Sequence, residues 1–219
     1  METLSTLEQE IFDALKSRRP DLDLSFDALL DVHQRLITLY DGNGTLFICG
    51  NGGSHADSIH IAGELCKSFE RKRPISDELA ENLTGLPWGD ELSEHLEAGL
   101  AAIPLGISGA LKTAVENDSP LRDIAFAQEL CALAKPGDVL LSVSTSGNAP
   151  NCQMAQSTAS AMGCTTVALT GAHGGKLATH ADIAVRTAGD STALVQEGHI
   201  SLWHTMCLLI EAHYFLEKR

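Results

Sequence analysis

The chain has 219 residues, of which 44% are apolar, 20% charged and 5% aromatic, and its formal net charge is −14 at pH 7. A chain of this length and apolar content can bury a core as one or two globular domains, which excludes disorder throughout. The acidic excess argues against a broad nucleic-acid surface, and no apolar run reaches the roughly 18 residues of a membrane span.

Two features of the sequence predict a cytoplasmic location. The first residues, METLSTLEQE, contain neither the basic nor the apolar region of a secretory signal. The cysteines form no C-x-x-C motif, and several fall in apolar segments, which is typical of buried reduced thiols. They are Cys49, Cys66, Cys131, Cys152, Cys164 and Cys207.

The first 43 residues are predicted to form two amphipathic helices. Residues 3–18 carry Leu4, Leu7, Ile11 and Leu15 at helical spacing, and Pro20 follows. Residues 24–41 show the same periodicity and stop at Gly42. Neither helix carries a recognisable chemical motif, and their apolar stripes are available to pack on a neighbouring subunit.

From residue 44 the pattern changes to short apolar strands that alternate with helices. The predicted strands are 45–50, 102–107, 138–144, 164–170 and 182–187. The predicted helices are 54–70, 109–116, 120–134, 148–162, 175–180 and 192–217. Nearly continuous apolar runs indicate strands buried on both faces, and the βαβ alternation predicts a doubly wound parallel α/β sheet.

Residues 76–97 interrupt this alternation. They hold seven acidic side chains and no Lys or Arg, with Gly85, Pro87 and Gly89 around Trp88. Such a segment is a solvated surface excursion, or it is a lid or oligomer contact that Trp88 anchors.

Three glycine-rich or hydroxyl-rich turns follow predicted strands. The first is GNGGS (Gly50 to Ser54), the second STSGN (Ser144 to Asn148) and the third LTGAHGG (169–175). Glycines let backbone amides approach a ligand, and helix N-termini favour anions. Because ligands of open α/β sheets lie beyond the carboxyl ends of the strands, we expect a phosphate site here. A tight turn without a ligand, or helix capping alone, would explain each motif separately.

Two pairs of polar residues lie on the helices next to these turns. His60 and Glu64 are four residues apart, which puts them on one face of the helix that GNGGS opens. Gln196 and His204 are eight residues apart on the last helix, so both can face one cleft. Each pair is also compatible with ordinary packing or with a polar patch on a core helix.

Taken together and in this order, GNGGS–x₅–H–x₃–E, ND, STSGN, LTG–x₂–GG and QE–x–HI–x₃–H resemble the SIS-domain phosphosugar isomerases, and most of all their phosphoheptose isomerase branch. The resemblance covers about residues 1–70 and 102–219. It implies a single SIS domain over 1–219, with a five-stranded parallel flavodoxin-like sheet, N-terminal helices and an acidic insertion at 76–97. It also implies a homotetramer whose active sites lie between subunits.

The resemblance also assigns functional residues. The substrate-binding positions are Asn51, Gly52, Gly53, Ser54, Glu64, Asn117, Asp118, Ser144, Thr145, Ser146 and Gln196. Glu64 and His204 are the implied acid/base pair, and which of them acts at carbon stays open. The ligands of one Zn²⁺ per subunit, found in some members, would be His60, Glu64, Gln196 and His204.

The implied activity is an aldose–ketose isomerisation of sedoheptulose 7-phosphate through an enediol. Three departures from the family pattern qualify it: the insertion at 76–97, Ala149 where a hydroxyl residue is common, and Gly109 where an acidic residue is expected. The alternatives are an isomerase of another sugar phosphate, a SIS domain that binds a phosphosugar without turnover, and a replication-initiator-binding assembly protein. Glu64 and His204 favour an enzyme over the last of these.

Overall fold

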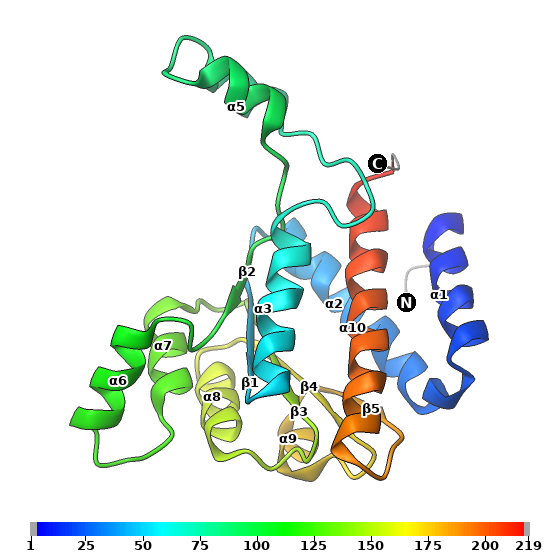
Figure 1. Cartoon of the computed structure of the whole chain (residues 1–219), viewed down its shortest axis with the longest axis vertical. Coiled ribbons are helices and arrows are strands. Elements are labelled where there is room, and N and C mark those ends of the chain that lie inside the picture. The colour runs from blue at the N-terminus through cyan, green and yellow to red at the C-terminus, as the bar shows by residue number, and fades with distance from the viewer. Residues whose placement is uncertain (1–3, 217–219) are drawn as a thin grey trace.

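A five-stranded parallel sheet forms the centre of the molecule (Figure 1). The computed structural model describes residues 4–216. The strands are β1 (Leu46–Gly50), β2 (Ala102–Pro104), β3 (Val139–Ser144), β4 (Thr165–Gly171) and β5 (Ile183–Thr187). Their order in the sheet is β2-β1-β3-β4-β5, and every neighbouring pair is parallel. The predicted doubly wound α/β fold is confirmed.

Helices cover both faces of this sheet. One layer contains α1 (Thr6–Arg18), α2 (Phe26–Asp41), α3 (Gly53–Cys66) and α10 (Thr192–Tyr214). The other contains α7 (Ala125–Leu133), α8 (Pro150–Ala161) and α9 (Gly175–His180), with α6 (Gly109–Asp118) packed on α7. Side chains of β1 alternate between the layers: Leu46 and Ile48 join the first core, Phe47 and Cys49 the second.

The element boundaries differ from the predicted ones where local backbone geometry intervenes. The predicted strand 102–107 ends at Pro104, and Gly106 then adopts a positive φ of 88°. The predicted helix 120–134 begins only at Ala125, after Asp123 with φ 65°. A 3₁₀ turn, η1 (Pro20–Ser25), occupies the start of the helix predicted at 24–41. Residue 3 of the first predicted helix and residue 217 of the last lie outside the described residues.

Residues 76–97 form a hairpin of two short helices, α4 (Asp77–Leu83) and α5 (Gly89–His95), that projects from the body (Figure 1). Trp88 at its tip is 74% exposed and has a left-handed backbone with φ 66°. The base is closed by an antiparallel bridge between Pro74 and Glu97 and by the Ala98 amide, which donates to the Arg73 carbonyl. The hairpin is thus a surface excursion, and a role as lid or oligomer contact stays a prediction.

Candidate functional site

The GNGGS turn connects β1 to α3 and brings α10 close to the sheet edge. Gly52 precedes the helix with φ 55°, in the region that favours glycine. A side chain on Gly53 would come within 2.5 Å of the Gln196 amide nitrogen. Glycine is therefore needed at position 53 for the contact that places Gln196 of α10 against the start of α3. The next residue, Ser54, is buried.

The STSGN turn after β3 interlocks with the turn after β4. The Gly171 amide donates to the Thr145 carbonyl at 3.0 Å, and the Leu177 amide donates to the Gly147 carbonyl at 2.9 Å. Beside these turns lies an open hollow of about 330 Å³ at the carboxyl edge of the sheet. Its lining includes Thr145, Ser146, Asn148, His173, Ser191 and Thr192. Hydroxyl, amide and imidazole groups of this kind are suited to an anion.

The predicted substrate residues fall into groups that the structure only partly brings together. Asn51 exchanges two amide hydrogen bonds with Asn151, at 2.9 and 2.8 Å, which ties the first turn to α8. Asn151 is absent from the residues predicted from the sequence, although it lies only three residues after the STSGN segment. Ser144 is buried at the end of β3 and does not line the hollow beside Thr145 and Ser146.

Asn117 and Asp118 lie at the end of α6, outside the hollow of the STSGN turn. The Asn117 amide donates to Asp118 at 2.9 Å, and no residue of α6 is buried. A second hollow does connect α6 with the first turn, because Lys112 and Glu116 line it together with Asn51. The substrate role of Asn117 and Asp118 therefore stays a prediction for this chain.

Helix α3 lies beside α10 (Figure 1). His60 and Glu64 of α3 and His204 of α10, which are predicted to carry the chemistry, meet there. His60 Nε2 is 3.0 Å from Glu64 Oε1, and the rings of His60 and His204 have centroids 5.4 Å apart. Trp203 packs against both imidazoles, with centroid distances of 4.7 and 3.9 Å, and Phe69 stacks on His204. Two imidazoles and one carboxylate thus form one partly exposed polar group.

The surroundings of His204 keep its imidazole neutral at physiological pH. Burial lowers the pKa of His204 first, nearby His60 and Arg18 lower it further, and the Glu64 carboxylate acts in the opposite direction. A neutral imidazole has a free lone pair, which is what a proton acceptor or a metal ligand requires. The arrangement is therefore suited to proton transfer or to metal binding.

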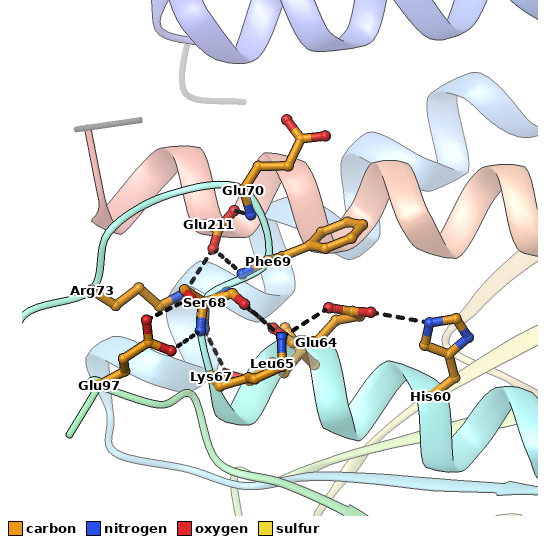
Figure 2. Close-up of polar contacts among 10 residues, drawn as sticks. All are labelled: His60, Glu64, Leu65, Lys67, Ser68, Phe69, Glu70, Arg73, Glu97 and Glu211. Atoms are coloured by element: carbon orange, nitrogen blue, oxygen red, sulfur yellow. Dashed lines mark hydrogen bonds and ion pairs between the residues drawn. The ribbon is translucent and has the colours of Figure 1, made fainter. Parts of the chain in front are cut away.

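The far end of α3 is fixed by a buried ion pair that the sequence gives no sign of (Figure 2). Arg73 Nε donates to Glu211 Oε1 at 2.8 Å, and both side chains are fully buried. The same guanidinium donates to the carbonyls of Leu65 and Glu64, at 2.7 and 3.1 Å. The last turn of α3, which carries the Glu64 carboxylate, is thereby held to α10.

Within residues 4–216, one group of three donor side chains has the tight spacing of a metal site, and it is not the group at His60, Glu64 and His204. The ligand atoms of Glu8, His33 and His213 are all within 4.8 Å of one another. Sequence reasoning missed this cluster, although a carboxylate and an imidazole at buried positions of amphipathic helices were a signal.

No helix among the described residues combines the length and apolar character needed to cross a bilayer.

Comparison with known proteins identifies the family. Residues 121–214 match the SIS domain. The phosphoheptose isomerase of Trichlorobacter lovleyi is 37% identical over 185 residues, which cover 84% of this chain and 82% of that protein. The probable phosphoheptose isomerase of Thermoplasma volcanium is 31% identical over 205 residues, covering 94% and 91%.

The comparison with a solved structure indicates the same family. The phosphoheptose isomerase of Francisella tularensis is similar with a TM-score of 0.73 at 25% identity, covering 97% of this chain and all of that one. Both the fold and the family expected from the ordered motifs are confirmed. The chain belongs to the phosphoheptose isomerase family of SIS-domain proteins.

Proposed function

We propose that this protein is an aldose–ketose isomerase that converts sedoheptulose 7-phosphate to D-glycero-D-manno-heptose 7-phosphate. The observation that carries the proposal is the meeting of His60, Glu64 and His204 where α3 lies beside α10, in a chain whose relatives are named phosphoheptose isomerases. The hollow beside Thr145 and Ser146 supports an anionic group on the substrate.

The spacing of these features favours a long, open-chain substrate. Glu64 lies 11 residues beyond Gly53 on α3, which is about 16 Å along a helix that rises 1.5 Å per residue. A phosphate held near the strand ends would leave the far end of a seven-carbon chain close to Glu64 and His204. A triose phosphate would be too short to reach both places.

The reaction needs one group that moves a proton at carbon and another that moves protons between oxygens. The proton passes from C1 of the ketose to C2, through a cis-enediol, while the carbonyl moves from C2 to C1. Glu64 and His204 are the proposed pair, and neutral His204 is in the form that accepts a proton. Burial against Trp203 and Phe69 limits the water around this imidazole.

The same side chains have the donor chemistry of a zinc ligand set. Two imidazoles and a carboxylate suit Zn²⁺, and we propose His60, Glu64 and His204 as ligands. Gln196, the fourth ligand that the resemblance implies, contacts Gly53 at the start of α3, so its side chain would have to turn toward His60 to complete the set. When bound, zinc would polarise the substrate carbonyl as a Lewis acid. A 3.0 Å hydrogen bond between His60 and Glu64 fixes the position of that carboxylate.

Assembly and location complete the proposal. We infer one SIS domain over 1–219, arranged as a homotetramer with active sites between subunits, because much of α6 and the hairpin at 76–97 is left exposed. All six cysteines are free thiols, which supports the cytoplasm.

The deciding experiment incubates the purified protein with sedoheptulose 7-phosphate and follows the aldose product directly. Glu64→Gln and His204→Asn should each lower turnover by about 10²–10⁴-fold, whereas binding of the sugar phosphate should persist. Binding without turnover by the parent protein would instead indicate a phosphosugar-binding SIS protein. Turnover of a different sugar phosphate alone would replace the substrate but keep the reaction.

A further inference from the structure

A second cluster of ligand-type side chains lies where α1, α2 and α10 meet, and its His213 is nine residues, about 14 Å, further along α10 than His204. His33 Nε2 is 3.0 Å from Glu8 Oε1, and His213 Nδ1 is 3.1 Å from the same oxygen. Glu8 and His33 are buried, whereas the His213 side chain is 31% exposed. Three helices thus direct two imidazoles and one carboxylate to a single point that solvent reaches from the His213 side.

The protonation states of this cluster suit a cation. Burial lowers the pKa of His33, so its imidazole is neutral at pH 7. Burial alone would raise the pKa of Glu8, but hydrogen bonds from Ser5 and His213 and the proximity of His33 together bring it below its ordinary value. Because an ionised carboxylate only accepts hydrogen bonds, the His33 and His213 nitrogens that face Glu8 carry protons, and metal binding at these atoms moves each proton to the other ring nitrogen or to solvent.

The distances agree with coordination as well as with hydrogen bonding. In a tetrahedral zinc site with bonds of about 2.0–2.2 Å, neighbouring ligand atoms are about 3.4 Å apart, and the two separations from Glu8 Oε1, 3.0 and 3.1 Å, are within a few tenths of that value. The three ligand atoms together lie within 4.8 Å of one another. The second oxygen of Glu8 accepts the Ser5 amide at 2.7 Å, which orients the carboxylate as metal ligands usually are oriented. His33 Nδ1 is buried and has no hydrogen-bond partner among the described residues, so a metal at Nε2 would leave the second ring N–H without the acceptor that metal-bound imidazoles usually have.

We propose that Glu8, His33 and His213 bind a divalent transition-metal ion of the zinc class, with one coordination position open to water beside His213. This site shares no residue with the proposed set at His60 and His204. The bound ion joins the first helix of the chain to its last, so that it stabilises the packing of α1 against α10. Its effect is on folding stability, because a ligand that binds only the folded state raises the unfolding temperature.

The test uses tag-free, full-length protein in which the other candidate site has been removed by His60→Asn and His204→Asn. After chelation and dialysis against limiting Zn²⁺, this background should retain about one zinc per chain by elemental analysis. Its unfolding temperature should rise by roughly 5–10 °C at free Zn²⁺ 100-fold above Kd. Adding His213→Asn or Glu8→Gln should abolish both effects, whereas Glu10→Gln, an exposed change on the same helix, should keep them.

Each variant separates coordination from hydrogen bonding. Glutamine at position 8 keeps the shape and an oxygen that accepts hydrogen bonds, but it removes the negative charge, which leaves two neutral imidazoles and a neutral amide to hold the divalent ion. His213 is partly exposed, so its replacement leaves a folded protein even if changes at the buried Glu8 do not. A background protein that takes up no zinc, or zinc uptake that survives His213→Asn, would overturn the proposal and leave a purely hydrogen-bonded cluster.

Discussion

The substitution Glu211→Gln tests the buried network that holds the end of α3. The Glu211 carboxylate accepts Arg73 Nε at 2.8 Å and the amides of Phe69 and Glu70 at 2.7 and 2.8 Å (Figure 2). Glutamine keeps the volume but removes the charge and offers one accepting oxygen where the carboxylate has two. The Arg73 guanidinium would then be left as an uncompensated charge in the interior.

The expected cost follows from this geometry. Because both side chains are fully buried, removing one partner should lower the free energy of unfolding by about 3–5 kcal/mol. A loss of this size is a large part of the 5–15 kcal/mol that is typical of whole domains. The double variant Arg73→Met/Glu211→Met should lose less than the sum of the two single variants, because it leaves no unpaired charge.

Urea unfolding at pH 7, followed by circular dichroism, measures these differences. Glu197→Gln is the matched control, since Glu197 lies exposed on the same helix and should change stability by less than about 0.5 kcal/mol. If Glu211→Gln cost less than about 1 kcal/mol, the network would contribute little, and the account of how α3 is anchored would be wrong.

Four further predictions address the chemistry, titration, ligand and assembly of the protein. The fold-loss of turnover in the double variant Glu64→Gln/His204→Asn should be far smaller than the product of the two single fold-losses, because the two groups act as a unit. Steady-state kinetics on the proposed substrate measures all three losses. Burial lowers the pKa of His199 from 6.5 to about 4, so between those values the unfolded chain binds a proton that the folded chain does not. The free energy of unfolding should therefore fall by about 3 kcal/mol as the pH drops from 6.5 to 4, which is about 1.4 kcal/mol per pH unit. Urea unfolding at several pH values measures this loss, and His199→Leu should remove the contribution of His199. Crystals grown with sulfate should show an anion near Ser146, and a well-ordered turn without one would count against the phosphate site. Light scattering should give roughly four times the chain mass of 23.3 kDa, and a monomer at micromolar concentration would exclude shared active sites.

Features encoded over short stretches of sequence could be predicted from the sequence. The strands buried on both faces are apolar almost without interruption, as in LFICG, and the glycine and hydroxyl turns stand directly behind them. The pairing of His60 with Glu64 follows from helical spacing alone. That this pair lies close to His204 could be predicted only from the family resemblance, because the spacing of residues on one helix does not indicate which other helix packs against it.

Contacts between distant residues could not be predicted in this way. Arg73 and Glu211 are 138 residues apart, and Glu8 and His213 are 205 apart. Each of these side chains taken alone is compatible with an exposed polar or charged position, and only the packing of distant segments brings it to its partner. The end of α3 at Cys66, earlier than predicted, has the same origin, since Arg73 binds the carbonyls of its last turn.

The loop that follows α3 also explains how the chain accommodates the acidic hairpin. The Glu97 carboxylate accepts hydrogen bonds from the amide and hydroxyl of Ser68, at 3.0 and 2.7 Å, so the returning strand is fixed to the loop that Glu211 holds from the other side (Figure 2). With both ends of the hairpin fixed at its base, extra length between them adds only a logarithmic cost in loop entropy. The anchoring of Glu64 then depends on the base of the hairpin and on α10, and the exposed residues around Trp88 are free to vary without disturbing it.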